Sequence, residues 1–257
     1  MYTQQPYRYR LDWGRRGVQQ AVEQGNILVI VDTLRFSTAA ITATHHGSLI
    51  YPCSLDEDAA ALARRIGGEV AVSRVGTPDK GRFSLSPATY FNIEPGTKVV
   101  LASPNGATCS RYGSQVPYLF IGALVNARAA AMAVSSLAAQ ENLAVTVIAC
   151  GERWKTPSEG GVLRIAIEDY LGAGAILSYV QGEKSPEAHV CAGAFVQVRD
   201  ELEHIIWDCG SGRELREKGL EDDVKHAARL NLYQTVPYMR GDHLEPYMPL
   251  SSFRPSG

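Results

Sequence analysis

The chain has 257 residues, of which 45% are hydrophobic and 20% are charged, a composition typical of a globular protein with a sizeable core. Its formal net charge of −2, with lysines and arginines scattered along the chain, gives no reason to expect binding to nucleic acid or to a membrane surface. No apolar run approaches the roughly 20 residues that a membrane-spanning helix needs, and the N-terminus lacks a signal-peptide pattern, so we expect a cytoplasmic protein.

Short apolar runs alternate with helical patterns in the first part of the chain. The runs predict strands at residues 27–31, 49–51, 70–72, 99–102, 118–121 and 145–149. Between them, Ser54 and Glu57 have the spacing of a capping box, and an alanine-rich helix follows to Ile66. Asn126 precedes a second alanine-rich helix that runs to about Gln140. This alternation predicts a three-layer α/β/α sandwich around a mostly parallel or mixed central sheet.

The second part of the chain is more helical, with patterns at 161–181, 186–207, 210–218 and 221–232. No sharp linker divides the chain. We therefore expect a single α/β domain over 1–257, with the alternative of two intimately packed subdomains, 1–150 and 151–237. Residues 238–257 contain several prolines and little periodicity, which predicts an extended tail. This tail either covers the surface, including that of a neighbouring subunit in a homodimer, or is a frayed terminus.

The most informative segment is the strand at 27–31 with the residues that follow it. Five consecutive apolar residues predict a fully buried parallel strand, Asp32 comes directly after it, and Arg35 follows three residues later. Ligands of α/β proteins bind at the carboxyl ends of such strands, where an acid suits a metal ion and an arginine suits an anion. The alternative is structural: Asp32 caps the next helix, and Arg35 pairs with Asp32.

Two later strand ends carry amide side chains. Asn105-Gly106 follows the strand at 99–102, and this turn either directs backbone N–H groups at an anion or is a plain turn. Asn126 follows the strand at 118–121, and it is either a helix cap or a hydrogen-bond donor to a substrate.

Cys150-Gly151 ends the strand at 145–149, but we do not expect the thiol to be a nucleophile. A cysteine-based phosphatase loop has arginine six positions after the cysteine, where this chain has Thr156, and Arg153 comes too early. The five cysteines are far apart and form no C-x-x-C pair, which argues against a disulfide framework and against a thiolate zinc site.

Glu168 and Asp169 lie in a helical pattern that is apolar nearly all the way round, which predicts a buried helix. Two buried acids are costly unless they are paired or bind a metal ion. Glu168 can pair with Arg164 one helical turn earlier, but this pairing leaves Asp169 unexplained. We therefore expect Asp169 to have a metal-binding or catalytic role.

Seven segments resemble, in the same order, motifs of the 2-phosphosulfolactate phosphatase family. They begin at Val31 (V-D-T-L-R), Pro104 (P-N-G), Gly122 (G-A-L-V-N-A), Cys150 (C-G), Ile167 (I-E-D-Y-L-G-A-G-A), Ser211 (S-G-R) and Gly219 (G-L-E-D-D-V). The similarity covers about residues 25–237, and it depends on the order of the motifs more than on any single one.

The resemblance implies magnesium-dependent hydrolysis of a small anionic phosphorylated substrate, 2-phospho-3-sulfolactate, to 3-sulfolactate and phosphate. Under this interpretation Asp32 and Asp169 bind Mg²⁺, and Glu168 is a further ligand or the base that activates water. The residues that would bind phosphate and sulfonate oxygens are Arg35, Arg74 and Arg213, with further contacts from Asn105, Gly106, Asn126, Cys150 and Gly151.

Two departures from the family pattern keep a rival function open. Ser73 and Ser84 stand where the family carries acids, which favours a divergent paralogue that binds or acts on another small anionic acid without phosphatase activity. A second rival is an aspartyl-phosphate phosphatase of the haloacid dehalogenase type, with Asp32 as nucleophile. That chemistry needs a second acid two residues later, where this chain has Leu34, so we rank it lower.

Overall fold

The computed structural model describes residues 3–72, 81–154 and 162–248. Its strands are β1 (Tyr9–Trp13), β2 (Ile27–Val31), β3 (Leu49–Cys53), β4 (Glu69–Val70), β5 (Lys98–Ala102), β6 (Leu119–Gly122), β7 (Val145–Ala149), β8 (Glu152–Arg153), β9 (Leu163–Arg164), β10 (Pro237–Arg240) and β11 (His243–Pro246). Its α-helices are α1 (Gly14–Glu23), α2 (Phe36–His45), α3 (Ala59–Ile66), α4 (Gly106–Gly113), α5 (Ala127–Glu141), α6 (Ile167–Tyr179), α7 (Pro186–Val198), α8 (Leu202–Asp208), α9 (Gly210–Glu217) and α10 (Glu221–Ala227).

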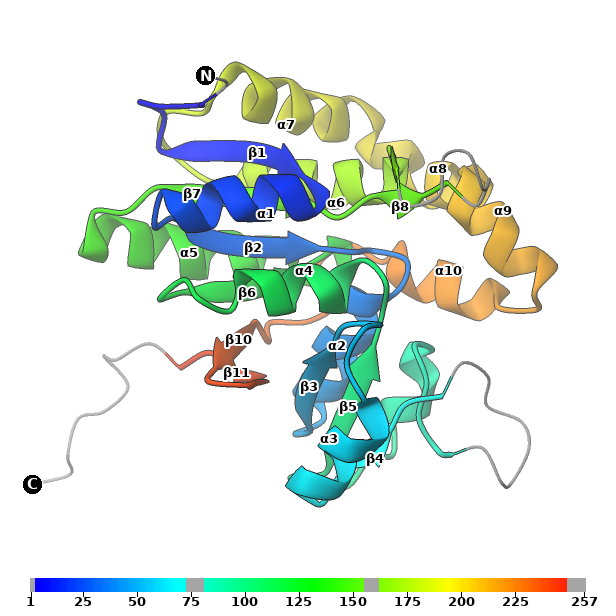
Figure 1. The fold of residues 1–257 in the computed structure, drawn as a ribbon. Coiled ribbons are helices and arrows are strands. Elements are labelled where there is room, and N and C mark those ends of the chain that lie inside the picture. Colours follow the sequence, from blue (N-terminus) through cyan, green and yellow to red (C-terminus); the bar gives the residue numbers. More distant parts are fainter. Residues whose placement is uncertain (1–2, 73–80, 155–161, 249–257) are drawn as a thin grey trace, which may run out of the picture.

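Within these ranges, nine strands form one mixed sheet in the order β1-β7-β2-β6-β10-β11-β3-β5-β4, and β8 pairs separately with β9. Helices cover both faces of the sheet, which confirms the predicted α/β/α sandwich. Figure 1 shows α1 and α4 in front of the strands and α5 behind them. No helix in the described ranges is long and apolar enough to cross a bilayer.

Strand β2 contributes to the cores on both faces of the sheet. Ile27, Val29 and Val31 share one core with side chains of α5 and α6. Leu28 and Ile30 belong to the opposite core, with side chains of α1, α2 and α4. Because both faces are covered, every position of this strand is apolar, as the sequence pattern predicted.

The strands that carry the candidate residues end level with one another. β2 runs parallel to β7 and to β6, and Val31 lies opposite both Ala149 and Gly122. β1 runs parallel to β7 on its other side, with Trp13 opposite Ala149. The segments that follow these strands, Asp32 among them, therefore start at one edge of the sheet.

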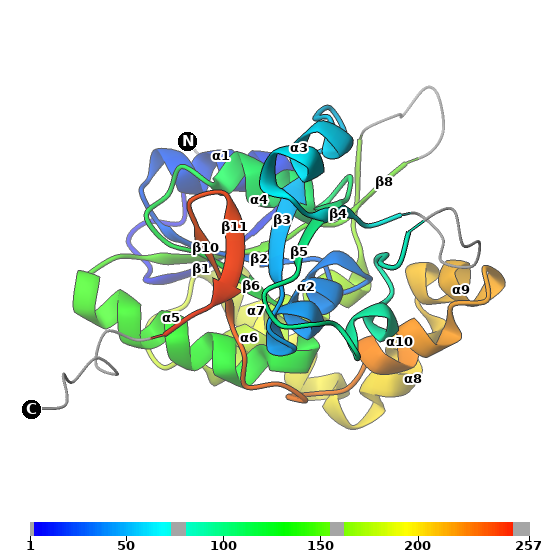
Figure 2. The same ribbon diagram turned by 90° about the horizontal axis from the view of Figure 1, so that it is seen from below.

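A C-terminal hairpin joins the two parallel parts of the sheet. β10 and β11 are antiparallel and lie between β6 and β3 in the strand order. Figure 2 shows the hairpin beside β3. Tyr238 lies opposite Phe120 of β6, and Leu244 lies opposite Ile50 of β3.

The prediction of an extended or frayed tail from residue 238 is therefore wrong as far as Pro246, because these residues form β10 and β11. Met239 and Leu244 are buried in the core shared with α2, so one face of this short segment is apolar enough to complete the sheet. Residues 249–257 lie outside the described part of the chain, and the homodimer that the tail suggested stays a prediction.

Helix α3 begins later than the sequence pattern indicated. Its first residue is Ala59, and the Asp58 side chain accepts a hydrogen bond from the N–H of Ala61 at 2.8 Å. Glu57 does accept from the N–H of Ser54, as in a capping box, but that contact closes the turn before the helix.

Helix α6 also begins later, at Ile167, because the preceding residues form β9. Glu168 and Asp169 therefore lie in the first helical turn, where the helix dipole favours carboxylates, and not in mid-helix. Among the described contacts no salt bridge joins Arg164 to Glu168. Arg164 instead donates to Ser211 at 3.3 Å, so the predicted i to i+4 pairing is wrong.

Candidate functional site

Asp32 links the end of β2 to the first residues of two helices. Its Oδ2 accepts a hydrogen bond from the N–H of Gly106 in α4 at 2.7 Å, and its Oδ1 accepts from that of Phe36 in α2 at 3.2 Å. The carboxylate is buried, with 5% of the residue exposed. A Cβ atom on Gly106 would lie 2.7 Å from Oδ2 and 2.4 Å from the Phe36 ring, so only glycine fits here.

Asp169 holds two strand ends together. Its Oδ1 accepts from the N–H of Thr33 at 2.7 Å, just beyond β2, and its Oδ2 accepts from the N–H of Gly151 at 2.8 Å, just beyond β7. Gly151 has a φ of +65°, a conformation that favours glycine. The segments after β2 and β7, which the sequence places far apart along the chain, are thus joined through the Asp169 carboxylate.

Two glutamates complete what we call the acid cluster, which is Asp32, Glu152, Glu168 and Asp169. Glu168 is buried, and its Oε2 lies 3.5 Å from the Cys209 thiol that donates to it. Glu152, on β8, is half-buried, and its Oε2 accepts from Asn105 Nδ2 at 3.0 Å.

Burial and mutual repulsion disfavour the ionised forms of these carboxylates. Burial, followed by the charge of Glu152, raises the pKa of Asp32 to about 7. Burial, followed by the charges of Asp32 and Glu168, raises the pKa of Asp169 well above its usual range. Burial and the charge of Glu168 also raise the pKa of Glu152. Several acids that repel one another in a buried site are stabilised by a cation.

The donor set fits a magnesium ion held in part by other ligands. Among the described residues no three His, Cys, Asp or Glu side chains form a ready-made cage. Magnesium is usually held by one or two carboxylates, with waters and substrate oxygens completing its shell. Asp32 and Asp169 supply two hard carboxylate groups, and burial together with the neighbouring acids raises the pKa of each, so a cation beside them would stabilise their ionised forms.

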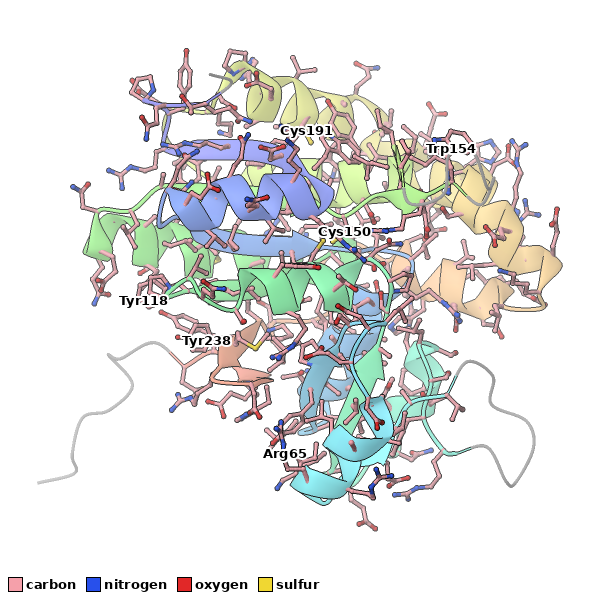
Figure 3. The ribbon with its side chains drawn as sticks, in the orientation of Figure 1. Arg65, Tyr118, Cys150, Trp154, Cys191 and Tyr238 are labelled. Carbon is pink, nitrogen blue, oxygen red and sulfur yellow. The ribbon has the colours of Figure 1, made fainter. Side chains whose placement is uncertain are left out.

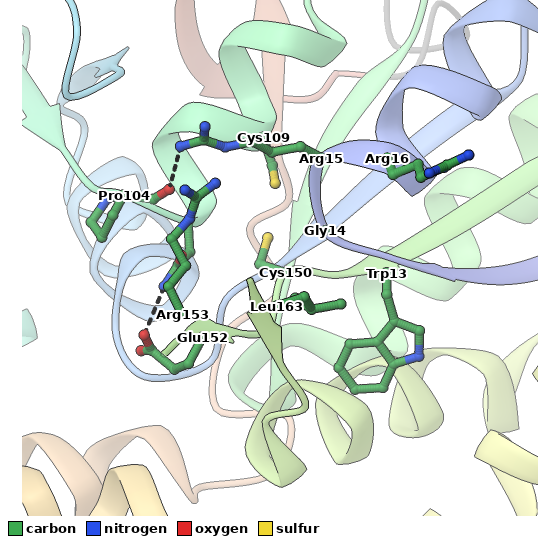
Figure 4. A pocket seen from close by; sticks show the side chains of 11 residues that line it. Trp13, Gly14, Arg15, Arg16, Pro104, Cys109, Cys150, Glu152, Arg153 and Leu163 are labelled. Carbon is green, nitrogen blue, oxygen red and sulfur yellow. Dashed lines mark hydrogen bonds between the residues drawn. The ribbon is translucent and has the colours of Figure 1, made fainter. Parts of the chain in front are cut away.

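A cavity of about 240 Å³ adjoins the acid cluster, and we call it the arginine cavity. Its walls include Arg15 and Arg16 of α1, Asn105 before α4, and Cys150, Glu152 and Arg153 after β7. Figure 4 shows the Arg15 and Arg153 side chains reaching the same side of the cavity, to the left of the Cys109 and Cys150 sulfur atoms. Glu152 belongs to both the cavity and the acid cluster, and Asn105, which also lines the cavity, donates to it, so the two regions adjoin.

Comparison with known proteins identifies the family of this chain. The sequence model of the 2-phosphosulpholactate phosphatase family matches residues 15–242. The chain belongs to the 2-phosphosulfolactate phosphatase family. A probable 2-phosphosulfolactate phosphatase of Carboxydothermus hydrogenoformans is 31% identical over 82% of this chain and 84% of its own length. The 2-phosphosulfolactate phosphatase of Methanocaldococcus jannaschii is 26% identical over 85% of this chain and 91% of its own length.

The family predicted from the ordered motifs is confirmed, and with it the enzyme class, the phosphoric monoester hydrolases. The matched range begins at Arg15 and includes the hairpin as far as residue 242. It therefore contains the acid cluster and all residues that line the arginine cavity except Trp13 and Gly14.

The structure brings most of the predicted site residues together but gives several of them internal partners. The N–H groups of Gly106 and Gly151 bind the carboxylates of Asp32 and Asp169. Asn105 binds Glu152. Cys150, at the end of β7 in the centre of Figure 3, is buried, and burial raises the pKa of its thiol well above the usual value, as expected for a residue that is not a nucleophile.

Arg35 forms an internal ion pair. Its Nη1 lies 2.6 Å from Oδ2 of Asp223 in α10, and both side chains are largely buried. Asp223 also accepts from the Ser86 hydroxyl. The predicted alternative, in which Arg35 pairs with Asp32, is wrong. A role for Arg35 in phosphate binding requires the guanidinium to contact substrate and Asp223 together.

Asn126 and Arg213 do not contact the acid cluster. The fully buried Asn126 amide accepts from the N–H of Ala123 and donates to the carbonyls of Ile121 and Thr235, so it fixes the chain between β6 and α5. Arg213 lies in the first turn of α9, not on a loop, and its exposed guanidinium pairs with Asp208 at 2.8 Å.

The geometry therefore does not support the predicted substrate contacts of Asn126 and Arg213. Arg74 and Ser73 lie outside the described residues, so the predicted role of Arg74 stays a prediction.

Sequence reasoning missed Arg15 and Glu152 as parts of the site and discarded Arg153. β1 was not predicted, because its residues Tyr9–Trp13 mix charged and aromatic side chains, and Arg15 was therefore not recognised as following a strand end. Arg153 was judged only against a thiolate phosphatase loop. The pattern that could have found all three is a charged residue within a few positions of each parallel strand end.

Proposed function

We propose that this chain is a magnesium-dependent phosphatase that hydrolyses 2-phospho-3-sulfolactate to 3-sulfolactate and phosphate. One observation carries the proposal: the carboxylates of Asp32 after β2, Glu152 on β8, and Glu168 and Asp169 on α6 are close enough for their charges to raise the pKa values of Asp32, Glu152 and Asp169, and they lie beside a cavity that contains arginines, within a chain of this family. A dianionic phosphoryl group can approach such acids only if a cation lies between them.

Asp32 and Asp169 would hold the magnesium ion. Each is fixed by two backbone N–H groups, so neither needs to reorganise when the ion binds. When bound, the ion would offset the negative charge on the phosphoryl oxygens and make water more acidic. The backbone N–H groups leave lone pairs of both carboxylates free for this purpose.

A glutamate would take the proton from the attacking water. Glu168 was the residue expected from the sequence, but only 2% of it is exposed. Glu152 lines the cavity, and Asn105 orients its carboxylate. Its raised pKa brings it nearer to the operating range of a general base. We therefore assign the proton-accepting role to Glu152 and a charge-balancing role to Glu168.

Phosphate release from 2-phospho-3-sulfolactate tests the function directly. Purified protein is stripped with a chelator and assayed before and after addition of Mg²⁺, with Ca²⁺ as a matched divalent control. We expect release only after Mg²⁺ is restored.

The rival function predicts a different outcome of the same assay. A divergent paralogue would bind 3-sulfolactate or a related acid and release no phosphate under any metal condition. The loss of an acid at Ser84 favours this rival. Ser84 is buried, and its hydroxyl accepts from the N–H of Ser86, so this position has an internal role.

A further inference from the structure

The start of α1 carries two positive side chains where a helix normally favours negative ones. Arg15 and Arg16 follow Gly14 in the first turn, no acid lies in that turn, and Trp13 at the N-cap supplies no side-chain acceptor. The helix dipole and the guanidinium groups therefore add positive charge at the same place, which an anion would balance.

A second strand end delivers another guanidinium to this place. Arg153, on β8, is half-buried, and both it and Arg15 line the arginine cavity. Burial and then the charge of Arg15 lower the pKa of Arg153, which shows that the two cations repel each other. Two arginines from separate elements that converge on one cavity form a site for an oxyanion.

The contacts of Arg15 hold it in position and leave part of its donor capacity unused. Its Nη2 donates to the carbonyl of Pro104 at 3.2 Å, and its guanidinium lies 5.5 Å from the centre of the Tyr112 ring. Its Nε is buried and has no hydrogen-bond partner among the described residues. A buried guanidinium nitrogen without a partner is costly, and a bound oxyanion would satisfy it.

We propose that Arg15 and Arg153 form a subsite for the sulfonate of the substrate, separate from the acid cluster where the phosphoryl group reacts. The assignment rests on the proposed function. Glu152 belongs to both regions, and 2-phospho-3-sulfolactate carries its phosphoryl, sulfonate and carboxylate groups within a few bonds of one another, so one molecule can present the phosphoryl group to the acid cluster and the sulfonate to the cavity. Magnesium held by Asp32 and Asp169 would offset the charge of the phosphoryl group, so the two arginines would serve the sulfonate.

The test compares substrates with and without the sulfonate. Arg15→Met and Arg153→Met are assayed with 2-phospho-3-sulfolactate and with 2-phospholactate, which has the same skeleton without the sulfonate. We expect KM for the sulfonated substrate to rise about 10- to 100-fold, the value of a charge-assisted hydrogen bond, with kcat and the KM for 2-phospholactate nearly unchanged. Two variants are used so that a folding defect in one, seen as a lower Tm, leaves the other to decide.

Arg128→Met is the matched control. Arg128 also lies in the first turn of a helix, α5, and its guanidinium lies 5.1 Å from the centre of the Tyr179 ring. It does not line the arginine cavity. An equal rise of KM for both substrates would overturn the proposal, because the cavity would then bind the phosphoryl group or the carboxylate, which both substrates carry. The proposal would also be overturned if Arg15→Met and Arg153→Met raised the KM for the sulfonated substrate no more than Arg128→Met does.

A binding measurement separates failure of this subsite from failure of the proposed function. If the wild-type protein hydrolyses neither substrate, calorimetric titration with 3-sulfolactate and with lactate still tests the subsite. The subsite is supported if the wild type binds 3-sulfolactate more tightly than lactate, and if Arg15→Met loses this difference while Arg128→Met keeps it. Equal affinity of the wild type for the two acids contradicts it.

Discussion

The acid cluster and the arginine cavity adjoin each other but are built differently. The aspartates of the acid cluster are buried and fixed by backbone N–H groups from strand ends and helix starts. Arg15 of the cavity is held by a ring contact and a carbonyl, and its Nε has no hydrogen-bond partner among the described residues. The difference suggests a division of labour in which the rigid acidic part does the chemistry and the adaptable basic part selects the substrate.

The substitution Asp32→Asn should have the largest effect, because it tests whether the acid cluster does the chemistry. The amide can still accept from Gly106 at 2.7 Å, but it loses the charge that would hold the metal, so we expect kcat to fall on the order of 10²- to 10³-fold. The weaker contact to Phe36 is lost. Burial places the pKa of Asp32 at about 7, so above that pH the folded protein carries a costly ionised group, which the amide removes. Tm should therefore change little at pH 8.

Phosphate release and thermal melting on the same preparations check this prediction. A large fall in Tm with kcat retained in the folded fraction would mean that Asp32 is only a helix cap.

Glu152→Gln distinguishes the two glutamates of the acid cluster. The glutamine can still accept from Asn105 but cannot take a proton, so we expect kcat to fall about 10- to 100-fold with KM nearly unchanged. Glu168→Gln is the matched comparison, with a smaller expected effect on kcat. Steady-state kinetics at saturating Mg²⁺ measures both, and the reverse order would return the proton-accepting role to Glu168.

Arg35→Met tests whether this arginine belongs to the site or to the scaffold. Removing it leaves Asp223 buried without its ion-pair partner, so we expect the free energy of unfolding to fall by about 3 kcal/mol. Turnover by the folded fraction should change by less than about threefold. Urea unfolding measures the stability, and Arg35→Met/Asp223→Leu should recover part of it. A kcat/KM loss at constant stability would instead restore the phosphate-binding role predicted from the sequence.

Arg213→Ala should have the smallest effect. Its guanidinium is exposed and pairs with Asp208 outside both functional regions. Exposed ion pairs contribute little, so we expect kcat/KM within about twofold of the wild type and no measurable change in Tm. A selective loss of activity would show that α9 moves its arginine toward the substrate during the reaction.

The sequence predicted the central strand and the acids better than the cations. An apolar strand followed by Asp32 and a buried helix that carries Glu168 and Asp169 are local patterns, although the helix begins at Ile167 and not at residue 161 as predicted. The partner of Arg35 could not be predicted, because Asp223 lies 188 residues away and only the packing of α10 brings it close. Arg15 was missed because β1 is recognisable as a strand only through its pairing with β7.

The position of the β10–β11 hairpin also constrains how the chain can be made. The strands that bridge β6 and β3 are the last of the sheet to leave the ribosome. Until they emerge, β6 and β3 each expose an unpaired edge, and such edges invite association between nascent chains. Production of this protein should therefore depend on chaperone capacity during synthesis, and shortening the chain before Pro246 should yield insoluble material instead of a smaller enzyme.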